Sequence, residues 1–144
     1  MDILTAMQIS GSALKAERTR LNITAMNLAN ANTTRTMEGG PYRAKSVIFA
    51  AKPLPRSFGD TLQSSTDRLR QVEVVRVQED KVPFREVYDP SHPDADENGV
   101  VKMPNVNVVE QTVDMMNARR AYEANVTAID AAKSMALKAL DISR

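Results

Sequence analysis

The C-terminal part of the chain constrains the fold most, because residues 107–142 contain no glycine and no proline. Asn107 is a candidate helix N-cap, since Glu110 places an acidic side chain at the third helical position. Continued to Ile142, such a helix would be about 54 Å long. The sequence therefore predicts one uninterrupted helix that is much longer than the average helix of a globular protein.

Two apolar stripes run along this predicted helix. The first follows alternating three- and four-residue steps and includes Met115, Tyr122, Val126, Ile129 and Leu140. The second lies on another side and consists mainly of small residues: Val113, Ala121, Ala124, Ala128, Ala131, Met135 and Ala139. A single neighbouring helix buries a stripe of only about 100°. Because the two stripes together cover more than half of the circumference, we expect the second stripe to contact other chains.

Residues 2–32 carry a seven-residue repeat of apolar side chains, formed by Met7, Leu14, Leu21 and Leu28. This spacing predicts a long helix that packs along a seam, with Asp2 as its N-cap and with Asn30 and Asn32 near its end. Both predicted helices join the middle of the chain by their inner ends. If they pair, they must therefore run antiparallel, with the first stripe of the C-terminal helix facing this repeat.

The middle part of the chain alternates β-branched or aromatic runs with turn residues. The predicted strands are residues 45–51, 72–77, 84–88 and 100–103, and residues 53–67 are predicted to form a mobile loop. Val72 and Val74 alternate in one phase but Val75 and Val77 in the other, which indicates either a β-bulge or burial on both faces of the strand.

The predicted fold class is thus α+β. The helices of residues 1–34 and 105–144 would pair as an antiparallel coiled coil, and residues 35–104 would form a small β-rich middle domain. The expected shape is a stalk of two helices that carries a β head.

Composition argues against several classes of function. The formal net charge is only +1, with 19 basic and 18 acidic residues, so no surface for nucleic acid is expected. The chain has no cysteine and a single histidine, His92, which has no metal-binding or nucleophilic companion. We expect no cofactor and no cleaved signal peptide. We also expect no direct membrane insertion, since no segment approaches the roughly 20 apolar residues that span a bilayer.

An acidic loop in the middle part is the strongest candidate for a ligand site. Asp94, Asp96 and Asn98 match the first, third and fifth positions of a calcium-binding loop. The match fails at the twelfth position, where Asn105 stands in place of the bidentate glutamate. A solvated hairpin turn at Asn98–Gly99 is therefore favoured, and a calcium-regulated binding module is the alternative.

Four asparagines lie in or near the N-terminal helix, which is unusual for this residue type: Asn22, Asn27, Asn30 and Asn32. One interpretation is that they cap the helix end and cover a solvated face. The other is that amides in a helical interface fix the register between subunits.

Three segments resemble the flagellar basal-body rod and hook proteins. The first reads Asn-Ile-Thr-Ala-Met-Asn-Leu-Ala-Asn-Ala-Asn-Thr at 22–33, the second Met-Pro-Asn-Val-Asn at 103–107 and the third Arg-Ala-Tyr-Glu-Ala-Asn-Val at 120–126. The similarity covers essentially the whole chain, and residues 38–43 and 87–96 are typical of a proximal-rod subunit. The residues that carry the motif are Asn22, Asn27, Asn30, Asn32, Pro104, Asn105, Tyr122 and Asn125.

The resemblance implies a structural subunit of the proximal rod, which transmits motor torque and has no enzymatic activity. Its partners would be copies of itself, other rod proteins, the basal adaptor protein and the flagellar type III export apparatus. It would be exported without a cleaved signal and would assemble in the periplasmic part of the basal body. The terminal helices would form an inner coiled-coil layer, with the β region outside it.

Overall fold

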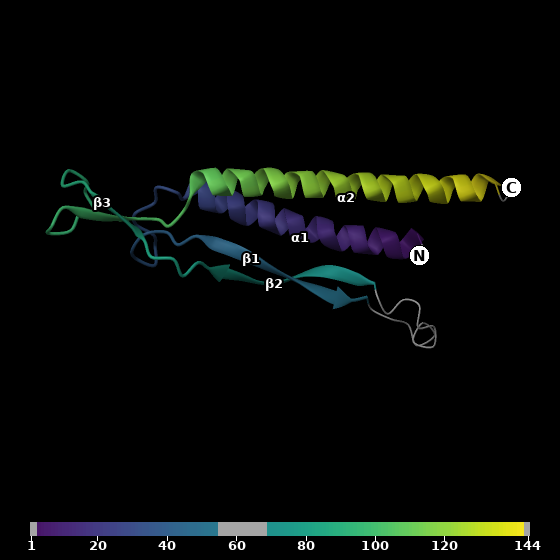
Figure 1. Cartoon of the computed structure of the whole chain (residues 1–144), viewed down its shortest axis with the longest axis horizontal. Coiled ribbons are helices and arrows are strands. Elements are labelled where there is room, and N and C mark those ends of the chain that lie inside the picture. Colours follow the sequence, from purple (N-terminus) through teal and green to yellow (C-terminus); the bar gives the residue numbers. More distant parts are fainter. Residues whose placement is uncertain (1–2, 55–68, 143–144) are drawn as a thin grey trace.

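The computed structural model describes residues 3–54 and 69–142, and this part of the chain contains two long helices and four strands (Figure 1). In chain order these are α1 (Ile3–Ala29), β1 (Lys45–Pro53), β2 (Arg70–Glu79), β3 (Arg85–Tyr88), β4 (Val100–Met103) and α2 (Val108–Ile142). The predicted α+β class is confirmed. The predicted cap at Asp2 and residues 55–67 of the predicted loop lie outside the described residues, while Pro53, predicted to begin that loop, belongs to β1.

The start of α2 is fixed by Asn107. Its side-chain Oδ1 accepts hydrogen bonds from the backbone N–H groups of Val109 (3.1 Å) and Glu110 (3.4 Å). Its carbonyl oxygen accepts the first helical bond, from the N–H of Gln111 (2.9 Å). These bonds satisfy donors that have no partner inside the first helical turn. The predicted N-cap is therefore confirmed, and α2 continues unbroken to Ile142.

Helix α1 ends in a turn built around Asn30. The backbone N–H of Asn30 donates to the carbonyl of Met26 (3.1 Å), and the side-chain amide donates a second bond to the same oxygen (2.9 Å). The N–H of Thr33 then bonds to the Asn30 carbonyl (3.1 Å). The predicted capping role of Asn30 is confirmed, because its side chain satisfies a carbonyl of the last turn.

Helices α1 and α2 pack against each other, and both chain ends lie at the same end of the pair (Figure 1). The two helices are therefore antiparallel. Since α2 contacts α1 but none of the described strands, Ala118 (0% exposed) and Ala132 (3% exposed) are buried against α1. Such small side chains let two helix backbones approach closely. An ion pair between Arg20 Nη2 and Asp114 Oδ1 (3.1 Å) also joins the helices, but it is partly exposed and contributes at most about 1 kcal/mol.

Ala118→Leu is expected to lower the free energy of unfolding by about 1–3 kcal/mol, because three extra carbon atoms must fit into a closed helix contact. Ala124→Leu is the matched control, since Ala124 is exposed on the same helix. Urea denaturation followed by circular dichroism measures both variants. Equal stability of the two variants would contradict the close contact at Ala118.

The sheet formed by β1 and β2 lies in a different place from the one predicted. Instead of forming a head at the end of the helices, both strands lie alongside α1, so that α1 is the middle of three layers (Figure 1). Ser12 Oγ in α1 accepts a hydrogen bond from the N–H of Val72 in β2 (3.1 Å). For β1 and β2 the expectation of a head is wrong, because α1 has a second face, away from α2, which this hairpin covers.

The predicted bulge is present in this antiparallel pair. Ile48 pairs with Arg76 and the next residue, Phe49, pairs with Val74, so that Val75 has no residue opposite it. Val72 and Val74 are half-buried, whereas Val75 and Val77 are exposed. The bulge therefore lies where the two pairs of valines change phase.

The second sheet is the antiparallel hairpin of β3 and β4, which extends beyond the helices at the end away from the termini (Figure 1). Its connecting loop closes through a hydrogen bond from the N–H of Gly99 to the carbonyl of Asp96 (2.9 Å). Gly99 has φ +74°, and a Cβ atom there would lie 3.0 Å from the Pro90 side chain. The predicted turn at Asn98–Gly99 is confirmed, because glycine avoids both the strain and the clash.

Candidate functional site: an asparagine junction and an exposed helix face

Asn27 in α1 is a buried polar side chain with four hydrogen bonds. It is only 1% exposed. Its Nδ2 donates to the backbone carbonyl of Lys45 and to Oε1 of Gln111, both at 2.8 Å. Its Oδ1 accepts from the hydroxyl of Tyr42 (2.8 Å) and from the N–H of Lys45 (3.0 Å). An amide side chain has two donor hydrogens and two acceptor lone pairs, so the capacity of Asn27 is fully used.

These bonds join three parts of the chain that are far apart in sequence. Asn27 belongs to α1, Tyr42 and Lys45 lie at the entrance to β1, and Gln111 lies in the first turn of α2. A buried polar network specifies one arrangement when every member is satisfied, because any other arrangement leaves donors unpaired. We call these four residues the asparagine junction, and it fixes where the β structure leaves the helix pair.

A second asparagine, Asn105, also bonds to the segment that leads into β1. Asn105 Oδ1 accepts a hydrogen bond from the N–H of Ala44 (2.9 Å), and its Nδ2 donates to the carbonyl of Val82 (3.2 Å). Arg43 also donates to the Val82 carbonyl (3.2 Å), and its guanidinium lies 4.2 Å from the centre of the Phe84 ring. A cation over an aromatic face adds about 0.5–1 kcal/mol at such a site.

The junction makes stability sensitive to alkaline pH. Burial, together with the nearby charge of Glu79, raises the pKa of the Tyr42 hydroxyl above its ordinary value of about 10. The neutral hydroxyl is thus favoured in the folded state. The contribution of this hydroxyl to folding stability is complete below about pH 10 and is lost as the pH rises through the folded-state pKa.

Tyr42→Phe removes the hydrogen bond to Asn27, so at neutral pH it should lower the free energy of unfolding by about 1 kcal/mol. The stability difference between the natural protein and the variant is expected to be constant up to about pH 9 and to shrink above about pH 10. Urea denaturation at a series of pH values measures it. A difference that grows with pH would show that the ionised hydroxyl is the stabilised form.

The residues predicted to pack between helices or subunits fall into two groups. Those half-buried within the single chain are Met7, Leu14, Leu21, Leu28, Met115, Tyr122 and Ile129. Those exposed are Ala124, Val126, Ala128, Ala131, Met135 and Leu140. The sequence reasoning missed the two fully buried positions of α2, Ala118 and Ala132. Ala118, Asn125 and Ala132 are spaced seven residues apart, and this repeat could have predicted that the two alanines are buried.

The motif residues are also divided by the structure. Asn27 and Asn105 are in or beside the asparagine junction, and Pro104 is buried next to it in sequence. Asn125 is half-buried and donates to the carbonyl of Ala121 within α2 (2.8 Å). Asn22 and Asn32 are exposed and lie outside the junction. The interface role predicted for the asparagines was between subunits, so the buried role of Asn27 within a single chain was not predicted.

Helix α2 presents an apolar face that α1 does not cover. We call this set of exposed residues the outer face: Val113, Ala124, Ala128, Ala131, Met135 and Ala139. At about 100° per residue they fall within a sector of about 80°, which lies directly beside the side of the helix that carries the buried alanines. The larger side chains in it, Val113 and Met135, are 50% and 58% exposed.

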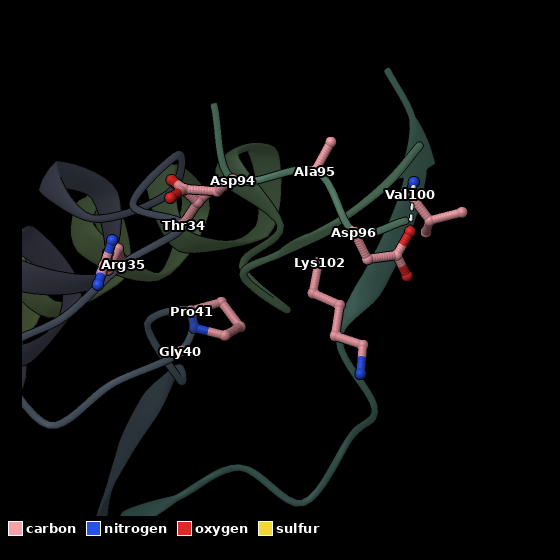
Figure 2. A pocket seen from close by; sticks show the side chains of 9 residues that line it. All are labelled: Thr34, Arg35, Gly40, Pro41, Asp94, Ala95, Asp96, Val100 and Lys102. Carbon is pink, nitrogen blue, oxygen red and sulfur yellow. Dashed lines mark hydrogen bonds between the residues drawn. The ribbon is translucent and has the colours of Figure 1, made fainter. Parts of the chain in front are cut away.

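The acidic loop is organised as a turn. Figure 2 shows the hollow between this loop and residues 34–41. Asp94 Oδ2 accepts a hydrogen bond from the Thr34 hydroxyl (2.7 Å), while Asp96 Oδ1 accepts from the N–H groups of Asn98 (2.9 Å) and Val100 (3.0 Å). The two carboxylates thus serve different partners. Over residues 3–54 and 69–142, no three metal-ligating side chains gather at one place. The geometry gives the calcium alternative no support.

Neither described helix is long and apolar enough to cross a membrane. The two features of the structure that stand out are therefore a fully satisfied polar junction and an uncovered apolar helix face. Both are features of a protein that positions rigid parts and contacts other proteins.

Comparison with known proteins defines the class. A family model described as "Flagella basal body rod protein" matches residues 7–35, and one described as "Flagellar basal body rod FlgEFG protein C-terminal" matches residues 97–142. These matches and the relatives below show that the chain belongs to the family of flagellar basal-body rod proteins.

Among the curated relatives, the flagellar basal-body rod protein FlgC of Salmonella typhimurium is 42% identical over 145 residues, covering 100% of both chains. The FlgC proteins of Borreliella burgdorferi (40% over 149 residues, covering 99% of this chain and 98% of the relative) and Bacillus subtilis (40% over 152 residues, covering 100% of both) are similarly related.

Proposed function

We propose that this chain is a structural subunit of the flagellar basal-body rod and that it acts by assembling with other subunits. The observation that carries this proposal is the outer face of α2. Apolar surface of this kind marks protein–protein contacts. Within residues 3–54 and 69–142 no third helix is present to cover it, and α1 already lies between α2 and the β1–β2 sheet.

Within the subunit, residues 1–34 and 105–144 would form an antiparallel coiled coil, and residues 35–104 would form the β-rich part. Burial of Ala118 and Ala132 at fourteen-residue spacing supports regular packing of this kind. In the assembled rod, the helix pairs would lie in an inner layer and the β hairpins outside them. The outer face would meet neighbouring subunits, while Met7, Leu14, Leu21 and Leu28 would face the first stripe of α2.

The role proposed is mechanical. A rod that transmits motor torque must not shear between its layers, so its subunits need a fixed angle between helices and β structure. The asparagine junction supplies that fixed angle, because its four hydrogen bonds tie α1, α2 and β1 together.

The partners follow from the same proposal. They are copies of this chain, other rod proteins, the basal adaptor protein and the type III export apparatus, which would deliver the chain without a cleaved signal. Its place would be the proximal, periplasmic part of the rod. The names of the relatives, which are basal-body rod proteins, support the assignment to the basal body.

Purified basal bodies test the proposal. We expect an antibody against this chain to detect it in basal bodies that have been washed with detergent and salt, because burial of the outer face makes the contact stable. Recovery of the chain in the soluble fraction only, from cells that carry complete flagella, would refute a structural role in the rod.

A further inference from the structure

All sulfur atoms of this chain belong to methionines, because the sequence contains eight methionines and no cysteine. In the part of the chain that the structure describes, three methionine side chains are exposed and the others are half-buried. Met37 is 107%, Met135 58% and Met116 51% exposed. An exposed thioether is open to oxidation, which converts a flexible apolar side chain into a polar one.

The three exposed methionines lie in different places. Met37 is in the connection between α1 and β1, and Met116 lies on α2 in the sector that carries charged residues such as Glu123. Met135 is the member of this group that belongs to the outer face. Oxidation at Met135 therefore changes the surface that the proposed function buries, and oxidation at the other two does not.

Met135 projects from a surface of small side chains. Ala131 and Ala139 lie about one turn before and after it, and Ala128 lies two turns before it. Each alanine carries a single methyl group, so the longer side chain of Met135 stands out from the outer face. A flexible apolar side chain of this kind fills a gap in a facing surface, and such a side chain acts as an anchor of a protein contact.

We propose that oxidation of Met135 to the sulfoxide prevents the free chain from joining the rod. This rests on the proposed function and adds to it a chemical control of the outer face. Hydrogen peroxide is the oxidant. The sulfur lone pair attacks one peroxide oxygen, the O–O bond breaks, a sulfur–oxygen bond forms, and the other oxygen leaves as water. The sulfur is oxidised by two electrons and the peroxide is reduced by two.

The sulfoxide blocks assembly because its oxygen is a strong hydrogen-bond acceptor. The methyl groups beside it on the outer face offer no donor, so burial leaves this oxygen unbonded, which is unfavourable. A subunit that has already assembled is protected, because its neighbour covers Met135. The change is reversible, since methionine sulfoxide reductases restore the thioether.

Two substitutions at Met135 separate polarity from shape. Met135→Gln imitates the sulfoxide, because glutamine is uncharged, polar and of similar length, whereas Met135→Leu keeps an apolar side chain without sulfur. Methionine, glutamine and leucine are all good helix formers, so α2 is retained. In a strain without the natural gene, immunoblots of purified basal bodies should show at least about tenfold less Met135→Gln than natural chain. Met135→Leu and the matched control Met116→Gln should be incorporated like the natural chain.

Exposure to hydrogen peroxide while the chain is being produced tests the oxidation itself. Tryptic cleavage after Lys133 and Lys138 gives a peptide that contains Met135 as its single methionine, so mass spectrometry reads its oxidation directly. We expect the sulfoxide in unincorporated natural chain, and we expect incorporation of the natural chain to fall. Incorporation of Met135→Leu under the same exposure should not fall.

The outcomes separate this inference from the function on which it rests. If the natural chain is missing from basal bodies of untreated cells, the rod assignment fails. If Met135→Gln is incorporated as well as Met135→Leu, the inference is wrong while the rod assignment stands. It is also wrong if Met135 of the free chain stays unoxidised, or if peroxide lowers the incorporation of the natural chain and of Met135→Leu equally.

Discussion

Asn27→Leu is expected to lower the free energy of unfolding by about 3–5 kcal/mol. Leucine has nearly the size of asparagine but makes none of its hydrogen bonds, so Lys45, Tyr42 and Gln111 lose their partners in a buried place. Each buried group left unpaired costs about 1–3 kcal/mol. Urea denaturation followed by circular dichroism gives the difference, and the melting temperature should fall by about 10–15 °C for a chain of this size.

Asn22→Leu is the matched control, because Asn22 lies on the same helix but is exposed and outside the junction. We expect it to change stability by less than about 0.5 kcal/mol. If both variants lose the same stability, the effect comes from changed helix propensity rather than from the junction, and the rigid connection between helices and β structure is not supported.

Ala128→Glu is expected to abolish motility while leaving the isolated chain folded. Ala128 is exposed in the single chain and lies at the centre of the outer face, so a glutamate there costs the monomer little. In the assembled rod the carboxylate would be buried without a partner, which costs several kcal/mol. Since about 1.4 kcal/mol is a tenfold change in an equilibrium, assembly would fail by several orders of magnitude. Swarming in soft agar and immunoblots of purified basal bodies measure the loss.

Ser134→Glu introduces the same charge on the same helix, in the sector of α2 that already carries charged residues. Ser134 is exposed, and we expect cells with this variant to swim normally. Normal swimming with Ala128→Glu would mean that the outer face is not an interface. Equal loss with both variants would point to a general effect of negative charge on export or folding.

Local features were predictable from the sequence because short-range chemistry determines them. Asn107 caps α2 through bonds to residues two and three positions ahead, and Gly99 is required by a left-handed turn. The bulge opposite Phe49 was readable from the phase of the valines in β2. Each of these depends on a few neighbouring residues.

The junction and the place of the β1–β2 sheet were not predictable, because both depend on contacts between distant segments. Asn27 bonds to Lys45 and Gln111, which are 18 and 84 residues away. The side of α1 that receives the sheet consists of small and polar residues such as Ser12 and Ala16, so it shows no apolar periodicity. The outer face was visible in the sequence as a stripe. Whether α1 covers that stripe depends on the rotation of α2 about its own axis, which the sequence pattern does not determine.

Deletion of the gene, followed by electron microscopy of purified basal bodies, tests the rod assignment most directly. We expect particles that keep the membrane ring but lack a completed rod and hook, with restoration by a plasmid copy of the natural chain and not by the Ala128→Glu form. Complete rods and hooks in the deletion strain, with no second copy of the gene present, would contradict it.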